Sequence, residues 1–256
     1  MTRSYQYNYS IIEPSVFDHE LRSRKGRTVV RVCQDFTGSE DLSQLNLLDV
    51  GSSSGIIDNY LADYFKHVSG IDIDEPAMDH AKSTYKKKNL EFAHGDAMQL
   101  ENHDNSVDVI LCSHVYEHVP DAKQMFAEIF RVLKPGGFCY FSGNNRVMLM
   151  EPHHRLPFLS LLPRPLAHVY MRITGKGDYY HEKHVSFWSL LNLVSAFNRI
   201  DYSEKVIADP EKFAVSYMLR KGSFKWRAAN FVASRLKWAT PHIWILQKPM
   251  SPGGSA

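Results

Sequence analysis

The chain has 256 residues, of which 44% are hydrophobic and 23% charged, so it can bury one large core. Its formal net charge of +2 gives no overall indication of a polyanionic partner. Three cysteines (Cys33, Cys112 and Cys139) show no CxxC spacing, which argues against a disulfide framework or a zinc site and favours a reducing compartment.

The N-terminal residues 1–10 are polar and rich in tyrosine, without the apolar stretch of a signal peptide. No uninterrupted apolar run is long enough to span a bilayer. We therefore expect a cytoplasmic protein, with peripheral contact to the inner face of a membrane as an open alternative.

Short apolar runs occur in the first 145 residues, each too short for a helix and bounded by Gly, Asp, Ser or Asn. This pattern predicts buried strands. The runs are 45–50, 68–73, 107–112 and 138–142, with a weaker one at 90–93.

Helical patterns lie between these runs, at 57–65, 75–88 and 121–133. The third begins at a capping aspartate, Asp121, and stops at Lys134-Pro135-Gly136-Gly137. Strands that alternate with helices predict an α/β fold with a parallel sheet and right-handed crossovers.

The first predicted strand leads into a turn bounded by glycines, Gly51-Ser52-Ser53-Ser54-Gly55, which would open a helix. Such a turn lets the backbone approach a ligand closely and directs N–H groups outward. Ligand-binding turns and purely structural turns share this pattern, so the turn by itself leaves both interpretations open.

Polar residues follow the next strands at regular intervals. Asp72 comes about twenty residues after the glycine turn, where a carboxylate can accept both ribose hydroxyls. Asp96 follows the third strand, and Ser113 and His114 follow the fourth. These groups would all lie at the carboxyl ends of adjacent parallel strands, where open α/β sheets bind ligands.

The succession of motifs resembles the class I S-adenosylmethionine-dependent methyltransferase superfamily. The matching residues are Asp49/Gly51/Gly55, Gly70/Asp72, Gly95/Asp96/Ala97, Asp108, Glu117/His118 and 131–137 (R-V-L-K-P-G-G). The resemblance covers residues 45–143 strongly and the remainder loosely. It implies a Rossmann-like, seven-stranded, mostly parallel sheet with an antiparallel last strand, and S-adenosyl-L-methionine as cofactor.

The resemblance also implies three groups of cofactor contacts. The methionine end would be held by Asp49, Gly51, Ser52, Ser53 and Gly55. The adenosine would be held by Asp72, Ile73, Asp96 and Ala97. The sulfonium would lie beside Ser113 and His114. Because the family usually has glycine where this chain has Ser53, we expect a slightly different turn or a hydroxyl that faces solvent.

An NAD-dependent dehydrogenase would share the turn and the ribose carboxylate. It predicts G-x-G-x-x-G, a pattern that Ser53 and Ile56 break, and it does not predict the later motifs. The methyltransferase interpretation is therefore favoured.

Residues 180–190 resemble the E-x-H-x-x-x-[FY] segment that precedes a late helix in many of these enzymes. His184 would be the general base, with His181 or Glu182 orienting it or substituting for it. Alternatively, His184 caps a helix expected at 186–197. A metal site built from these histidines with His153 and His154 is disfavoured, because their spacing is not that of a zinc motif.

Two segments are both basic and apolar. Residues 146–172 contain four prolines and a single acid, and residues 220–248 contain seven Lys/Arg, three tryptophans and no acid. The second segment would lie between two final strands at 203–207 and 242–247. These segments either form a lid with solvated charges or lie on an anionic membrane beside the acceptor.

We expect five parts: an N-terminal cap (1–40), the cofactor-binding core (41–145), an acceptor lid (146–185), the rest of the core with a basic aromatic insertion (186–249) and a flexible tail (250–256). The expected reaction is O-methylation of a glycan, a lipid-linked intermediate or a related small metabolite. The run from Glu151 to Leu159 loosely resembles methyltransferases of bacterial cell-surface glycan and lipid-linked sugar pathways. A quinone or aromatic acceptor, or a binding protein without turnover, is the alternative. Nucleic acid is disfavoured because no base-methylation motif or RNA-binding module occurs.

Overall fold

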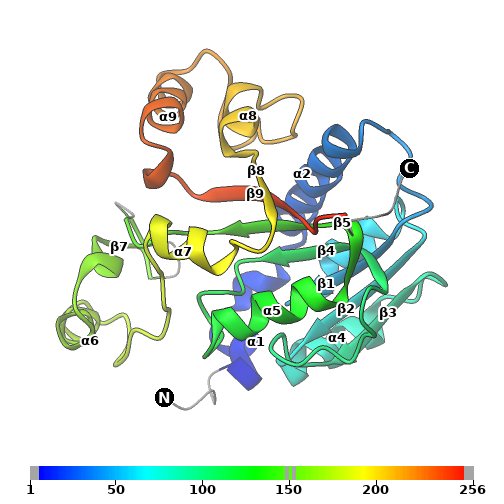
Figure 1. Ribbon diagram of the computed structural model, residues 1–256. Helices are drawn as coiled ribbons and strands as arrows, with labels where there is room; N and C mark the ends of the chain where they lie inside the picture. The colour runs from blue at the N-terminus through cyan, green and yellow to red at the C-terminus, as the bar shows by residue number, and fades with distance from the viewer. Residues whose placement is uncertain (1–5, 148–149, 152–153, 251–256) are drawn as a thin grey trace.

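The computed structural model describes residues 6–147, 150–151 and 154–250. Seven strands form one sheet in the order β3-β2-β1-β4-β5-β9-β8 (Figure 1). The pairs from β3 to β5 are parallel, and β9 is antiparallel to both of its neighbours. The predicted fold class, including the antiparallel last strand of the sequence, is confirmed. The strands are β1 (Asn46–Val50), β2 (His67–Asp72), β3 (Leu90–His94), β4 (Val107–Ser113), β5 (Leu133–Gly143), β8 (Asn198–Asp201) and β9 (His242–Gln247).

Alternate residues of the central strands enter two separate hydrophobic clusters, because successive side chains of a strand point to opposite faces. Ile110 and Cys112 face a cluster that also includes α5 (Ala122–Val132) and α7 (Phe187–Leu193). Val109 and Leu111 face a cluster built with α2 (His19–Thr37), α3 (Ile56–Leu61) and α8 (Ser203–Ala208). The sheet is therefore covered on both faces.

The strand predicted at 203–207 is wrong, since these residues form α8. The sequence Ser-Glu-Lys-Val-Ile-Ala is rich in helix formers, and sheet pairing falls instead on β8, where Ile200 lies opposite Ile245. Three helices also end several residues earlier than predicted: α3 covers Ile56–Leu61, α4 covers Glu75–Thr84, and α7 begins after its N-cap Ser186 and ends at Leu193. Asp121 caps α5 as expected.

The N-terminal segment comprises η1 (Gln6–Asn8), α1 (Tyr9–Ile12) and η2 (Pro14–Phe17). Ser10 donates hydrogen bonds to Asp74, directly after β2, and Gln6 donates one to the His118 carbonyl, beyond β4. Ser54 of the glycine turn donates to the Val16 carbonyl. This segment therefore crosses the carboxyl edge of the sheet and covers the turn after β1.

The chain between β5 and α7 forms a small unit of its own, which also lies at the carboxyl edge. It contains β6 (Met150–Glu151), β7 (Leu156–Pro157), η3 (Leu159–Leu161) and α6 (Arg164–Ile173). Leu159, Met171 and Tyr180 belong to its separate hydrophobic cluster. A backbone hydrogen bond from Lys183 to Glu117 (2.7 Å) attaches it to the segment that follows β4, and one from Arg146 to Val185 (3.0 Å) joins its two ends.

The second basic segment contains α9 (Phe224–Arg235) and η4 (Lys237–Ala239), between α8 and β9. Among the described residues, no helix is long and apolar enough to cross a bilayer. His153 and nearly all of the predicted tail lie outside the described residues.

Candidate functional site

The turn after β1 is fixed by close contacts that only glycine tolerates. Gly51 has φ 91°, and a Cβ there would come within 2.4 Å of the Val115 side chain. Gly55 has φ 74°, and its Cβ would come within 2.7 Å of the Phe92 ring. The Gly51 and Ser52 amides both donate to the Ile71 carbonyl, which ties the turn to β2.

Ser53 adopts a left-handed conformation with φ 53°, which glycine would occupy without strain. Its amide donates to Asp72 Oδ2 at 2.8 Å. The expectation of a solvent-facing hydroxyl is wrong, because Ser53 Oγ is buried and has no hydrogen-bond partner among the described residues.

Three carboxylates converge beneath this turn: Asp49 on β1, Asp72 on β2 and Asp58 in α3. Asp49 is 3% exposed and Asp58 is fully buried. Burial, reinforced by the neighbouring carboxylates, raises the pKa of Asp49, and burial raises the pKa of Asp58 to about 7. Burial also raises the pKa of Asp72, although three backbone amides oppose this shift. The group therefore favours a cationic ligand, which would stabilise the ionised forms.

Two cations of α2 approach the same site, and sequence patterns did not identify them. Burial lowers the pKa of Arg22. Electrostatic interactions with Tyr9, Asp49, Asp72 and Asp58 act in the opposite direction and raise it. Burial and the Arg22 charge lower the pKa of Lys25 to about 8, although the charge of Glu117 acts to raise it. Arg22 and Lys25 are three residues apart and so share one helix face. This spacing in the sequence could have indicated Arg22 and Lys25. The position of Asp58 in the first turn of α3 could likewise have indicated Asp58.

The end of β3 adjoins the end of β2, as the spacing predicted. The Gly95 amide donates to the Asp72 carbonyl at 2.9 Å, and Asp72 pairs with His94 in the sheet register. The Asp96 carboxylate accepts the Met98 amide at 2.9 Å. Ile73 and Ala97 lie beside these carboxylates and are partly buried. Asp49, Asp72 and Asp96 thus follow three adjacent strands at one edge.

The tip of β4 holds a histidine in an unusual conformation. His114 has φ 58°, its amide donates to the Ser142 carbonyl, and Ser113 Oγ lies 2.8 Å from Ser142 Oγ. His114 Nδ1 lies 3.3 Å from Oε1 of the fully buried Glu117. Burial by itself would raise the pKa of Glu117. The hydrogen bond with His114 and the charges of His114, His118 and His184 have the larger effect and lower the pKa to about 2. Glu117 is therefore an ionised, buried partner for the His114 ring.

A buried acid–histidine cluster lies where the 146–185 unit meets the sheet; it comprises Glu117, Glu151, His154, Glu182 and His184. The His184 side chain is 1% exposed, and its Nε2 lies 3.6 Å from Oε1 of the fully buried Glu151. His154 Nε2 lies 3.3 Å from Glu182 Oε2. Burial lowers the pKa of His154, but hydrogen bonding and charge from Glu182 raise it overall.

The predicted catalytic residues separate into two groups. His184 and Glu182 join the buried cluster, and His184 interacts electrostatically with Glu117 near the β4 tip, whereas His181 is exposed. Helix α7 is capped by the Ser186 hydroxyl, so the interpretation of His184 as the helix cap is wrong. Among the described residues, no group of His, Cys, Asp or Glu is arranged to hold a metal ion.

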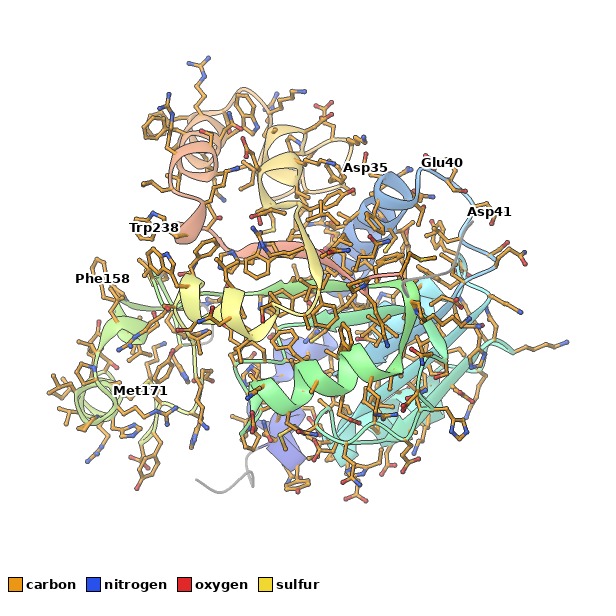
Figure 2. All side chains as sticks on the ribbon, viewed as in Figure 1. Asp35, Glu40, Asp41, Phe158, Met171 and Trp238 are labelled. Carbon is orange, nitrogen blue, oxygen red and sulfur yellow. The ribbon has the colours of Figure 1, made fainter. Side chains whose placement is uncertain are left out.

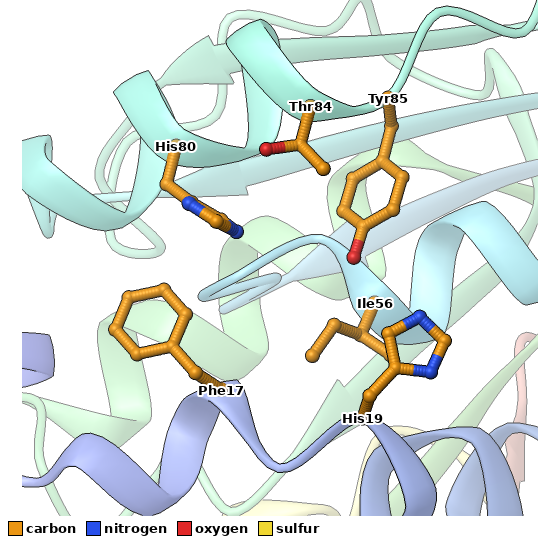
Figure 3. A pocket seen from close by; sticks show the side chains of 6 residues that line it. All are labelled: Phe17, His19, Ile56, His80, Thr84 and Tyr85. Carbon is orange, nitrogen blue, oxygen red and sulfur yellow. The ribbon is translucent and has the colours of Figure 1, made fainter.

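A pocket of about 450 Å³ lies to one side of these groups, between α4 and the N-terminal segment. Figure 3 shows its six side chains around one hollow: Phe17, His19, Ile56, His80, Thr84 and Tyr85. It adjoins the glycine turn only through Ile56 and contains no carboxylate. We therefore place the candidate site at the strand tips, where the charged groups converge.

Comparison with known proteins agrees with this geometry. Residues 48–141 match a family described as a methyltransferase domain. A "Probable S-adenosylmethionine-dependent methyltransferase" of Mycolicibacterium smegmatis is 35% identical over 102 residues (40% of this chain, 39% of the relative). A ubiquinone biosynthesis O-methyltransferase of Hydrogenovibrio crunogenus is 26% identical over 150 residues, 57% of this chain and 58% of the relative. The chain thus aligns with less than two thirds of the length of either relative.

Solved structures share the fold at low sequence identity. The [4+2]-cyclase SpnF has a TM-score of 0.51 at 19% identity, covering 86% of this chain and 82% of SpnF. A phosphoethanolamine N-methyltransferase of Haemonchus contortus has a TM-score of 0.52 at 16% identity, covering 86% of this chain and 51% of that one. Residues 48–141 thus match a methyltransferase domain, and together with the motifs and the site these matches support the class I S-adenosylmethionine-dependent methyltransferase superfamily, with S-adenosylmethionine as cofactor.

Proposed function

We propose that this protein transfers a methyl group from S-adenosylmethionine to a hydroxyl oxygen of an acceptor. The observation that carries the proposal is the convergence of Asp49, Asp58 and Asp72 with Arg22 at the strand tips. The amino-acid end of the cofactor has an ammonium and a carboxylate, and the adjacent sulfur is positive. Buried carboxylates beside one arginine match this distribution of charge.

Each part of the cofactor has a residue of suitable chemistry. Asp49 would accept from the ammonium, and Arg22 would donate to the carboxylate. Asp72 accepts the Ser53 and Asp74 amides, and its two oxygens offer further lone pairs to the ribose hydroxyls. Asp96 would accept from the adenine amino group. Ile73 would cover the adenine ring.

When bound, S-adenosylmethionine supplies a methyl carbon that is already activated by the sulfonium. A new C–O bond forms as the S–C bond breaks, S-adenosylhomocysteine is released, and the hydroxyl proton passes to a base. The residues around the β4 tip must therefore align the acceptor and take up one proton.

For this base we favour His114 over His184. The His114 side chain is 33% exposed, whereas that of His184 is 1% exposed and lies against Glu151. The ionised Glu117 carboxylate stabilises the protonated imidazole of His114 and favours hydrogen on Nδ1, which gives Nε2 the lone pair. In this proposal His184 and Glu182 are positioning residues that hold the cluster together.

The acceptor is proposed to carry a hydroxyl group on a largely apolar molecule. One similar protein is a ubiquinone biosynthesis O-methyltransferase, and another, from Listeria welshimeri, is a demethylmenaquinone methyltransferase (32% identical over 120 residues, 46% of this chain and 44% of the relative). Quinone precursors therefore join the glycan and lipid-linked acceptors expected from the sequence. Quinone precursors that carry a free hydroxyl share with glycan and lipid-linked acceptors the chemistry that the β4 tip would serve.

Calorimetry with S-adenosylmethionine and S-adenosylhomocysteine tests the cofactor site. We expect both to bind the native protein and Asp72→Ala to lose binding, while Asp79→Ala, at an exposed position on α4, binds as the native protein does. Absence of heat with both ligands would remove the proposal. Binding without methyl loss across hydroxylated quinone precursors and glycosides would favour a binding protein without turnover.

A further inference from the structure

Helix α6 is apolar on two sides, of which the fold uses only one. Ala167 and Met171 are buried in the cluster of the 146–185 unit. Leu166, Val169 and Ile173 are 57%, 46% and 79% exposed. Their spacing of three and seven residues places these three side chains along one stripe of the helix. Folding of the described chain therefore leaves an apolar stripe in contact with water.

More exposed apolar side chains precede this helix. Phe158 is 52% exposed and has φ 57°, a left-handed conformation that is costly for an aromatic residue. Leu161, in η3, is 40% exposed. Both flank Leu159, which packs with Ala167 and Met171 of α6, so they belong to the same small unit as the stripe. We call Phe158, Leu161, Leu166, Val169 and Ile173 the α6 surface.

The charge around the α6 surface is mainly positive, and the exposed acid Asp178 follows two residues after Lys176. Residues 154–176 contain Arg155, Arg164, Arg172 and Lys176 and no acid. Of these, Arg155, Arg172 and Lys176 are exposed, and none of them takes part in an ion pair within the described chain. The surface thus combines exposed apolar groups with cations that have no ion-pair partner in the part of the chain that the structure describes.

A further group of acidic residues lies at the other end of the molecule. Figure 2 labels Asp35, Glu40 and Asp41 on the side away from Phe158 and Met171. There the acids meet cations, as in the pairs Lys212–Asp35 and Arg31–Glu40. The exposed cations beside α6, in contrast, have no ion-pair partner in the described chain, so they are suited to a negative surface presented from outside.

We propose that the α6 surface rests on an anionic lipid bilayer, with its apolar stripe in the interfacial region and Arg155, Arg172 and Lys176 beside the headgroups. An amphipathic helix with flanking cations binds a membrane through the apolar area it buries and its attraction to anionic lipids. The 146–185 unit follows β5 and is hydrogen-bonded to Glu117, so this contact places the site near the bilayer surface. An acceptor with a lipid tail reaches the strand tips from that surface. The contact itself does not depend on methyl transfer.

Vesicle flotation of the full chain without added cofactor or acceptor tests this proposal. The probes are phosphatidylcholine vesicles and vesicles of an equal mixture of phosphatidylcholine and phosphatidylglycerol. We expect recovery with the anionic vesicles and little with the neutral ones. Arg172→Glu should lower partitioning about 25-fold, since each charge near such a surface changes it by roughly fivefold. Ile173→Ser should lower partitioning about tenfold through lost apolar burial.

Matched variants separate this surface from other causes. Lys86→Glu, a similar charge reversal at an exposed position just after α4, should leave partitioning within about threefold of the native protein. Ile173→Leu should bind as the native protein does. Because Ile173 and Arg172 are exposed, circular dichroism should show all variants folded.

Two outcomes would overturn the proposal. The first is equal recovery with neutral and anionic vesicles, or with none. The second is unchanged binding of both α6 variants together with loss of binding in Phe231→Ser, since Phe231 is 63% exposed on α9 and would then mark the contact. Because flotation measures no activity, failure of this proposal and failure of the proposed methyl transfer are distinguishable.

Discussion

The cofactor half and the acceptor half of the site are built in opposite ways. In the cofactor half, the groups follow β1, β2 and β3 in chain order, and the sheet register brings them together. In the acceptor half, Glu117, Glu151 and His184 come from three separated segments and meet through packing and backbone contacts. The comparison teaches that strand order positions the motif carboxylates of a cofactor site, to which α2 and α3 add Arg22 and Asp58, whereas an acceptor site depends on how a less regular unit docks.

The largest effect is expected at the glycine turn. Gly51→Ala places a Cβ 2.4 Å from Val115 at φ 91°, so cofactor binding should be lost and the free energy of unfolding should fall by about 3 kcal/mol. Gly38→Ala is the matched control, because Gly38 also has positive φ (67°) but its Cβ would meet nothing within 4 Å. Its cost should be limited to about 1 kcal/mol of backbone strain, with cofactor binding intact. Equal losses in the two variants, measured by calorimetry and denaturant unfolding, would contradict the close-contact argument.

The next effect separates the two proposed bases. His114→Ala should lower turnover of an acceptor by roughly a hundredfold or more without weakening cofactor binding, because it removes proton uptake at the β4 tip. His184→Ala should act mainly on the KM for acceptor and on stability, since it disrupts the buried cluster around Glu151. Measurement of kcat and KM across pH distinguishes them. If His114→Ala keeps full turnover while His184→Ala loses it, the assignment reverses.

The carboxylates of the cofactor half predict a pH dependence. Burial raises the pKa of Asp58 to about 7, so the folded protein holds a proton there that an unfolded chain releases near pH 4. Stability should therefore fall as pH rises through this window. A cationic ligand favours the ionised carboxylate, so cofactor binding should release protons below pH 7 and weaken by at most about tenfold per pH unit on acidification.

Calorimetry in buffers of different ionisation enthalpy measures this proton release. Asp58→Asn should reduce it, while Asp79→Asn on the exposed side of α4 should not. Proton uptake by the native protein on binding would contradict the proposed role of the buried carboxylates.

A smaller effect tests the acceptor half by itself. Because the pKa of His154 is raised in the folded state by Glu182, the pair should stabilise the protein at low pH and lose this contribution as pH rises through the folded pKa of His154. Glu182→Gln should remove this dependence at a cost of about 1 kcal/mol at pH 6. Urea unfolding at pH 6 and pH 8 measures it, and cofactor affinity serves as the control that should not change. A pH dependence identical to that of the native protein would contradict the pairing.

The smallest expected effect is a gain. Ser53→Gly should stabilise the protein by about 1 kcal/mol, because it relieves the φ of 53° and removes a buried hydroxyl that lacks a partner within the described chain. Thermal unfolding measures this, with Ser54→Gly as a control that should destabilise by removing the hydrogen bond to Val16. A lower melting temperature for Ser53→Gly would show that the hydroxyl has a role we have not assigned.

The sequence alone determined the parallel strands, the type of sheet by family resemblance and the carboxylates at its edge. Short apolar strands, glycine turns and regular spacing are local features, and parallel strands bring their carboxyl ends together. One motif residue has a structural role: Asp108, at the start of β4, binds Lys134 and the Asn46 amide.

Only the tertiary structure decided which other residues reach the site. Arg22 and Lys25 come from a helix far along the chain from the strand tips, and Asp58 enters because α3 packs beneath the turn. The tertiary structure also showed that His184 is buried against Glu151, that His181 is exposed, and that residues 203–208 form a helix. Burial and charge pairing depend on the sum of contacts between distant segments, which no local pattern in the sequence contains.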